Sequence, residues 1–131
     1  MRDKRSGLAD YITLELIVTM SRAAASFESA IGDAAILLAY FDSSHKQSPD
    51  NAEVLKRAGL VMVLTAWETY VEDRAREAVQ DRLRILNGSP VGKFVLAKLE
   101  EEIKRFHNPG AEKTRRLFLD YLEIDVTAGW S

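Results

Sequence analysis

Three prolines divide this chain into helical segments, and they constrain its fold more than any other feature. Each follows a residue that commonly caps a helix, in the pairs Ser48-Pro49, Ser89-Pro90 and Asn108-Pro109. Serine and asparagine side chains accept hydrogen bonds from the free amides of a first helical turn. Proline suits the first helical position because its missing N–H would be unpaired there. The three pairs therefore predict three helix starts and four helical segments.

Apolar spacing sets the expected lengths of these helices. The pattern predicts a first helix over residues 8–42, a second over 50–86, a third over 90 to 105 or 106, and a fourth over 109–122. Gly88, in the break after the second helix, suits a left-handed position. The tail over 123–131 has no helical periodicity and is expected to be extended or loose. No run of residues alternates as a strand would.

The apolar stripes predict an all-α bundle in a single domain over residues 1–131. In the first helix, Leu38 and Phe41 belong to the stripe. The second helix carries apolar residues at steps of three and four, namely Leu60, Leu64, Trp67, Val71, Ala75 and Ala78. The third is expected to bury Phe94, Val95, Leu99, Ile103 and Phe106. Because a short turn joins the first two helices, we expect an antiparallel helical bundle with two long and two shorter helices.

The composition excludes several classes of function. The chain has no cysteine and only two histidines, His45 and His107, which rules out disulfides, thiolate catalysis and a multi-histidine zinc site. No close Asp/Glu pattern indicates a Mg²⁺ site, and no glycine-rich phosphate loop occurs, so we expect neither metal nor cofactor. The formal net charge of −2 argues against a uniformly basic surface for nucleic acid and leaves room only for a local basic groove.

The hydropathy of the chain predicts neither a secretory signal nor a membrane span. The longest uninterrupted apolar stretch, AAILLAYF, is far shorter than the roughly 20 residues that a spanning helix needs. Charged residues interrupt the apolar segments near the N-terminus. We therefore expect a cytoplasmic protein without a membrane partner.

The segment LTAWETYVED, residues 64–73, places Glu68 between Trp67 and Tyr70 at the edge of the apolar stripe. A carboxylate beside aromatic rings can acquire a raised pKa and donate a proton, or anchor an arginine. The alternative is a boundary residue that reaches solvent or pairs with a lysine or arginine on a neighbouring helix. The following EDRAREAVQDRLR, residues 72–84, mixes both signs of charge at helical spacing and is interpreted as a solvated helix face.

The segment EEIKRFHNPGAEKTRRLF, residues 101–118, gathers basic residues around an Asn-Pro-Gly break. Asn108 is expected to cap the fourth helix and Pro109 to begin it. Basic residues close to a helix start oppose the helix dipole, which weakly indicates a functional or interface role. Pairing with nearby carboxylates is the alternative. The candidates for RNA binding here are Arg105, His107, Arg115 and Arg116.

Two stretches together resemble a known family. They are LVMVLTAWETYVEDRAREAV, residues 60–79, and FHNPGAEKTRRLFLDYLEIDVTAGW, residues 106–130. The likeness lies in the Trp-Glu-x-Tyr pattern of the first stretch and the His-x-Pro, Arg-Leu-Phe and Ile-Asp patterns of the second. Over roughly residues 54–130 the chain resembles RiboL-PSP-type domains of the HEPN superfamily, prokaryotic helical domains of which many belong to toxin–antitoxin and phage-defence systems.

The resemblance implies a dimeric, metal-independent ribonuclease with an Arg-x(4–6)-His pair on one helix. The arginine would stabilise the phosphate, and the histidine would act as general acid and base for attack by the RNA 2′-hydroxyl. Neither histidine of this chain has an arginine five to seven positions before it. Arg105 and His107 are two positions apart, which places their side chains roughly 200° apart on a helix. The pair is expected on a helix after DVTAGW, so the resemblance implies a C-terminally truncated or shortened member, and no catalytic residue is assigned.

Three functional hypotheses remain at this point. The first is a HEPN-like domain of a defence or toxin–antitoxin system that forms a homodimer, has an RNA or antitoxin partner, and lacks nuclease activity in this chain. The second is a noncatalytic helical module for dimerisation or protein interaction. The third is an intact RNA-binding domain that uses the basic residues of segment 101–118.

Overall fold

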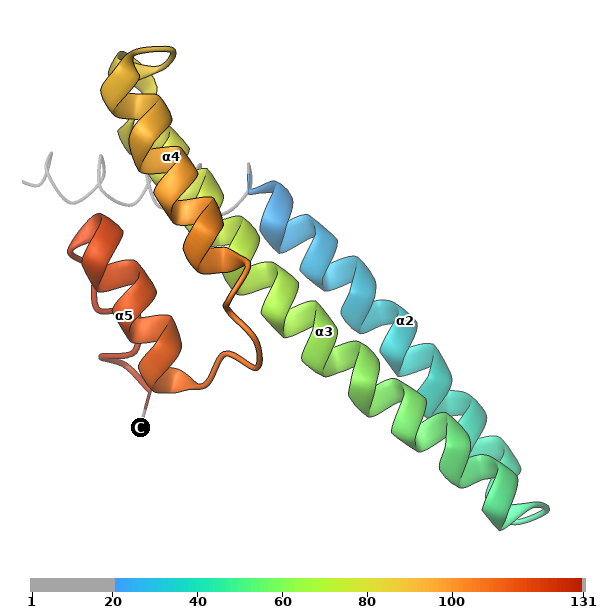
Figure 1. Ribbon diagram of the computed structural model, residues 1–131. Helices are drawn as coiled ribbons and strands as arrows, with labels where there is room; N and C mark the ends of the chain where they lie inside the picture. Colours follow the sequence, from blue (N-terminus) through green and yellow to red (C-terminus); the bar gives the residue numbers. More distant parts are fainter. Residues whose placement is uncertain (1–20, 131) are drawn as a thin grey trace, which may run out of the picture.

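The computed structural model describes residues 21–130, which form a bundle of helices (Figure 1). The elements are α2 (Arg22–Ser44), α3 (Pro49–Arg82), the short 3₁₀ helix η1 (Arg84–Leu86), α4 (Pro90–Ile103) and α5 (Ala111–Leu122). No strand occurs within the described range. The predicted all-α class, with two long helices and two shorter ones, is confirmed.

Helices α2 and α3 form a long antiparallel hairpin, and the remaining helices cover only part of it (Figure 1). Helix α3 has 34 residues, whereas α4 has 14 and α5 has 12. At 1.5 Å per residue, α4 reaches along less than half of α3. Helices α4 and α5 lie beside the C-terminal half of α3, and within residues 21–130 only α2 and α3 form the half of the hairpin near its turn.

The buried core lies where α3, α4 and α5 meet. Its side chains come from α3, α4, α5 and the loop between α4 and α5, namely Val71, Ala75, Val79, Leu99, Ile103, Phe106, Leu117, Phe118 and Leu122. Leu99 is fully buried within this cluster. The core thus anchors the two short helices to one end of the hairpin.

Two of the three predicted helix starts are confirmed. Pro49 and Pro90 each occupy the beginning of a helix. The Ser89 hydroxyl accepts a hydrogen bond from the Gly92 amide at 3.1 Å, as a serine cap should. Ser48 precedes α3 without such a side-chain bond. Gly88 has the predicted left-handed backbone, with φ of +80°.

The third predicted start, with Asn108 as cap and Pro109 as first residue, is wrong. Asn108 adopts a left-handed backbone with φ of 51°, and α5 begins at Ala111 after the extended Gly110. Tertiary contacts hold this segment as a loop. Phe106 is buried in the core, and the Trp67 indole donates a hydrogen bond to the Pro109 carbonyl at 3.2 Å.

Several other helix boundaries differ from those predicted by the sequence. The expected start at Leu8 lies outside the described residues, but the helix that leads to the hairpin turn begins at Arg22, because Ser21 is extended and caps it. That helix ends at Ser44 rather than at residue 42. Helix α3 ends at Arg82, and residues 84–86 form η1 instead of continuing it. Helix α4 ends at Ile103, two or three residues before the expected end, although Phe106 is buried as predicted.

Some stripe residues expected inside are exposed. Leu38, Leu60 and Leu64 lie on the hairpin, where no further described helix covers them, and more than half of each side chain is exposed. Phe94 was expected in the core, but it lies on the outer side of α4 and is 63% exposed. Helical periodicity identified these residues as apolar stripe members without showing which part of each stripe would be covered.

The tail after α5 is folded, which corrects the expectation of an extended or loose segment. Residues 126–129 form turns, and Val126 packs against the core. The Trp130 ring lies 5.8 Å from the Trp67 ring, measured between centroids. The tail therefore returns to α3 and packs on Trp67, whose indole also donates a hydrogen bond to the Pro109 carbonyl in the loop before α5.

Helix α2 is long and apolar enough, by length and composition, to cross a membrane. The same helix packs along α3 through its length (Figure 1). It also carries Glu28 and Asp33 on exposed positions. Contact with α3 buries Ala23 and Ala34, whereas Ile36, Leu38 and Tyr40 stay more than half exposed.

Candidate functional site

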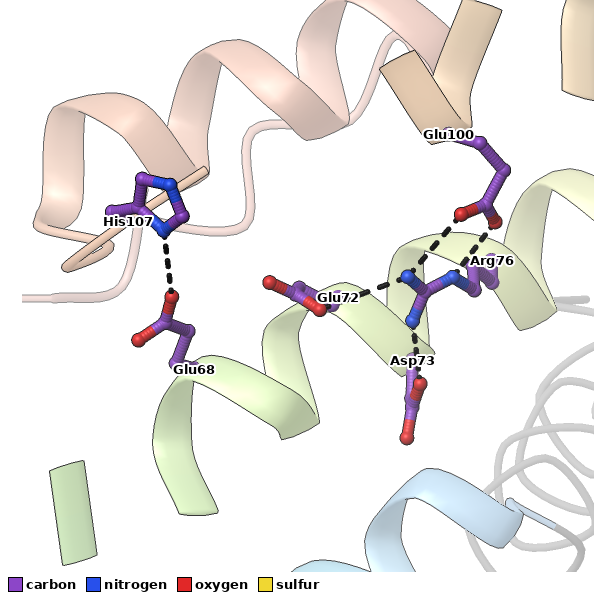
Figure 2. A network of polar contacts seen from close by, with 6 residues as sticks. All are labelled: Glu68, Glu72, Asp73, Arg76, Glu100 and His107. Carbon is purple, nitrogen blue, oxygen red and sulfur yellow. Dashed lines mark hydrogen bonds and ion pairs between the residues drawn. The ribbon is translucent and has the colours of Figure 1, made fainter. Parts of the chain in front are cut away.

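Helix α3 presents a row of charged side chains toward α4 and toward the loop between α4 and α5. Glu68, Glu72 and Arg76 follow one another at steps of four residues and so share one helical face (Figure 2). This row is the candidate site, because it contains Glu68 and meets His107 and Glu100 from the neighbouring segments.

Arg76 is the centre of an ion-pair network. Its Nε lies 2.8 Å from Glu100 Oε1 on α4, and its Nη1 lies 2.8 Å from Asp73 Oδ1. A longer contact of 3.7 Å joins Nη2 to Glu72 Oε2. Hydrogen bonding to Glu100 raises the pKa of Arg76 above its ordinary value. The network therefore fastens α4 to α3, and residues 72–84 are not simply a solvated face.

Glu72 lies between the network and the Glu68–His107 pair. Partial burial raises the pKa of the Glu72 carboxyl above its ordinary value, and Arg76 only partly opposes this effect. The carboxylates of Glu68, Asp73 and Glu100 act in the same direction as burial. Four carboxylates therefore lie close together here, those of Glu68, Glu72, Asp73 and Glu100, and the Arg76 guanidinium contacts the last three.

Glu68 and His107 face each other at the other end of the row. His107 Nδ1 lies 3.8 Å from Glu68 Oε1, which is an ion pair only when the imidazole is protonated (Figure 2). The histidine side chain is 76% exposed, and that of Glu68 is 29% exposed. Lys113 donates a hydrogen bond to the His107 carbonyl at 2.7 Å. Glu68 thus faces a histidine of the loop between α4 and α5, rather than the lysine or arginine of a neighbouring helix that was the expected partner.

The predicted basic residues do not form one site. Arg115 Nε lies 2.9 Å from Asp125 Oδ2 in the tail, an ion pair that raises the pKa of Arg115. Hydrogen bonds from Thr127 and then from Arg115 lower the pKa of Asp125. Arg105 and Arg116 are exposed and have no ion-pair partner among residues 21–130. The candidates thus separate into three groups: Arg115, which pairs with Asp125 in the tail; the Glu68–His107 pair; and the exposed Arg105 and Arg116.

Glu77 forms a structural contact that the local sequence did not indicate. Its carboxylate accepts hydrogen bonds from the Ala23 amide at 3.0 Å and the Ser21 hydroxyl at 2.9 Å, so it caps α2 from another helix. Arg74 also donates to it, at 3.2 Å. Desolvation alone would raise the pKa of Glu77, but these hydrogen bonds outweigh it and leave the pKa lowered. Ser21 and Glu77 are 56 residues apart, beyond the reach of any capping pattern read along the chain.

The described residues contain no arginine–histidine pair in contact. His107 faces a carboxylate, and no arginine contacts it within the described residues. Residues 21–130 contain no group of three or more His, Cys, Asp or Glu residues able to hold a metal ion. Arg76 makes ion pairs with protein carboxylates, so its guanidinium is not available to a phosphate.

Comparison with known families supports the resemblance on these elements. A model of the RiboL-PSP-HEPN family matches residues 22–129, which include the hairpin, both short helices and most of the tail. The chain belongs to the RiboL-PSP-HEPN family. The match begins at the first residue of α2, so this HEPN domain includes the first long helix, which the resemblance over residues 54–130 had left out. No curated protein and no solved structure gives a significant match.

The network of this HEPN domain gives a first testable prediction. Arg76→Met should lower the free energy of unfolding by about 1–2 kcal/mol, because three carboxylates lose their shared cation while part of the site remains open to solvent. Urea unfolding followed by circular dichroism measures the change. Arg82→Met is the matched control, because Arg82 is exposed on the same helix. Equal stability of the two variants would show that the network does not hold α4.

Proposed function

We propose that this HEPN domain is a cytoplasmic association module of a prokaryotic toxin–antitoxin or phage-defence system, that it forms a homodimer, and that these 131 residues do not cleave RNA by themselves. Family membership supports a module related to metal-independent ribonucleases. The defence context predicts that deleting the gene raises phage plaque counts on the host.

The lack of cleavage rests on the positions of the histidines. The chain's two histidines, His45 and His107, both lack an arginine at the family's catalytic spacing. His107 lies beside Glu68, which would oppose an approaching phosphate. Among residues 21–130 no arginine contacts the imidazole, so the arginine that would stabilise the charge of phosphoryl transfer in the family's arrangement is missing there.

The observation that carries the association role is an apolar groove on the hairpin. We call it the hairpin groove; it is lined by α2 and α3 residues Ile31, Ala34, Ala35, Leu38, Leu55, Lys56, Gly59, Leu60 and Val63. Among the described residues of this lining, Lys56 alone is charged. Exposed apolar surface of this kind marks interaction sites on small proteins.

The shape of the hairpin groove favours a second copy as its occupant. Ala34, Ala35 and Gly59 are small, whereas Leu38 and Leu60 are large and more than half exposed. A two-fold interface brings the same surface to itself, so the leucines of one copy can enter the small-residue region of the other. The product is a four-helix packing of two hairpins, which covers the stripe residues that the described chain leaves open.

Two measurements on the purified chain test the proposal. Light scattering should give the mass of a dimer, and a fluorescent single-stranded RNA should remain intact in EDTA under conditions in which an added metal-independent ribonuclease degrades it. A monomer at every accessible concentration would contradict the dimer. Cleavage that is lost in His107→Ala would contradict the absence of nuclease activity.

A further inference from the structure

The corner between α3 and α4 combines positive charge with exposed apolar side chains. Residues 82–98 contain four basic residues and no aspartate or glutamate, in a chain whose net charge is −2. The basic residues are all exposed and are Arg82, Arg84, Lys93 and Lys98. The same stretch exposes four large apolar residues, Ile85, Leu86, Val91 and Phe94. We call this surface the α3–α4 corner.

The apolar residues of the α3–α4 corner project from the molecule. Ile85 is 97% exposed, so almost none of its side chain contacts the protein. Phe94 is 63% exposed, and the Lys98 ammonium lies 6.0 Å from its ring centroid. The turn that carries Ile85 lies at one end of the molecule, away from α2 and α5 (Figure 1). Exposed anchors of this size beside arginines are typical of protein-binding surfaces.

The basic residues of the corner are largely free of internal partners. Arg82, Arg84 and Lys93 form no ion pair with any residue in the described range. Lys98 pairs with Glu101 at 2.9 Å, and both side chains are more than half exposed. The charge of the corner is therefore directed outward, unlike that of Arg76, which contacts three carboxylates.

Hydrogen bonds and close backbone packing define the backbone of the turn that carries these side chains. The Leu86 carbonyl accepts hydrogen bonds from the Ser89 hydroxyl at 2.6 Å and from the Ser89 amide at 3.0 Å. Gly92 approaches the same carbonyl so closely that a Cβ there would collide with it. Gly88 supplies the left-handed residue in between. Because the backbone of the turn is already fixed by these contacts, binding of a partner does not have to order it.

We propose that the α3–α4 corner is a docking surface for an acidic, amphipathic segment of another protein. Arg82, Arg84 and Lys93 bind its carboxylates, and Ile85 and Phe94 enter its apolar face. The planar guanidinium groups suit carboxylates in fixed positions. The proposal names the chemistry of a partner and requires neither the dimer nor the absence of RNA cleavage.

The same observations disfavour other anionic partners. Base stacking on RNA needs aromatic rings, whereas three of the four exposed apolar residues here are aliphatic. A lipid surface is bound by a broad apolar helix face. Helix α4 buries Leu99 and Ile103 on its inner side and leaves only a narrow strip, with Val91 and Phe94, facing outward.

Fluorescence anisotropy with a designed peptide tests the proposal. The probe is a labelled helix of leucine, glutamate and alanine with about five turns, compared with a peptide in which lysine replaces glutamate. The wild-type chain should bind the acidic probe, more weakly as salt increases. Arg84→Glu and Ile85→Ser should each weaken binding about tenfold or more. The matched controls Arg57→Glu and Ile36→Ser change exposed residues on the hairpin and should bind within about twofold of wild type.

Three results would overturn the proposal. One is absence of binding by the wild-type chain at low salt. Another is equal weakening by the hairpin controls, which would indicate attraction by overall charge. The third is a stronger, Arg84-dependent interaction with phosphatidylserine vesicles or polyuridylate than with the peptide. All four substituted residues are exposed, so unchanged thermal melting is expected. Failure here leaves the light-scattering and RNA measurements unaffected, which separates this proposal from the proposed function.

Discussion

Replacing Leu99 by alanine is expected to destabilise the fold by about 3 kcal/mol. Leu99 is 0% exposed and belongs to the cluster that joins α3, α4 and α5. Its loss removes buried apolar area and leaves a cavity that the three helices cannot fill without moving. A domain of this size unfolds with only about 5–15 kcal/mol, so the change is a large part of the total. Urea unfolding should show a lower midpoint, and thermal unfolding a decrease on the order of 10 °C.

Ile36→Ala is the matched control for Leu99→Ala. It also truncates a branched aliphatic side chain on a helix, but Ile36 is more than half exposed. Its cost should stay within about 0.5 kcal/mol. Similar effects of the two substitutions would mean that the core is not centred on the contact of α3, α4 and α5.

Leu60→Glu is expected to weaken dimerisation about 100-fold. Leu60 lines the hairpin groove and is 61% exposed. In a two-fold interface one substitution introduces two carboxylates into an apolar contact, where each must lose hydration and has only Lys56, which already pairs with Glu53, as a basic neighbour in the lining described. Light scattering over a concentration series should therefore report a monomer where the wild-type chain is a dimer.

The neighbouring Val61 supplies the control for this experiment. Val61 is 62% exposed, nearly the same as Leu60, but it does not line the hairpin groove. Val61→Glu should therefore remain dimeric. Circular dichroism should show the helical content of wild type for both variants. A Leu60→Glu dimer, or equal dissociation of both variants, would place the interface elsewhere.

The helical segments could be predicted because their signals are local. Ser89 caps α4 within one turn, and Pro49 begins α3, by contacts that involve residues close in the sequence. The Trp-Glu-x-Tyr segment around Glu68 is likewise a local pattern, and it indicates the family to which the chain belongs. Asn108 carried the same kind of local signal and failed. There, burial of Phe106 and the hydrogen bond from Trp67 determine the backbone.

The candidate site was predictable only in part. Glu68 was identified from its place at the edge of the apolar stripe, and His107 from its position before the helix break. Their proximity depends on how α4 and its following loop return along α3. Arg76 gave no local sign of its link to Glu100, which is 24 residues away in the chain.

The sequence by itself determined the helical composition, the short turn that makes the hairpin antiparallel, and the family. Only the tertiary structure decided which apolar faces are covered and which charges are paired. Helical periodicity predicts that Leu60 and Val71 belong to one stripe, but α4 is too short to cover both, so Val71 is buried and Leu60 is exposed. The arrangement of the helices also decides which polar groups are paired. It brings Glu77 to Ser21 and leaves Arg84 facing solvent.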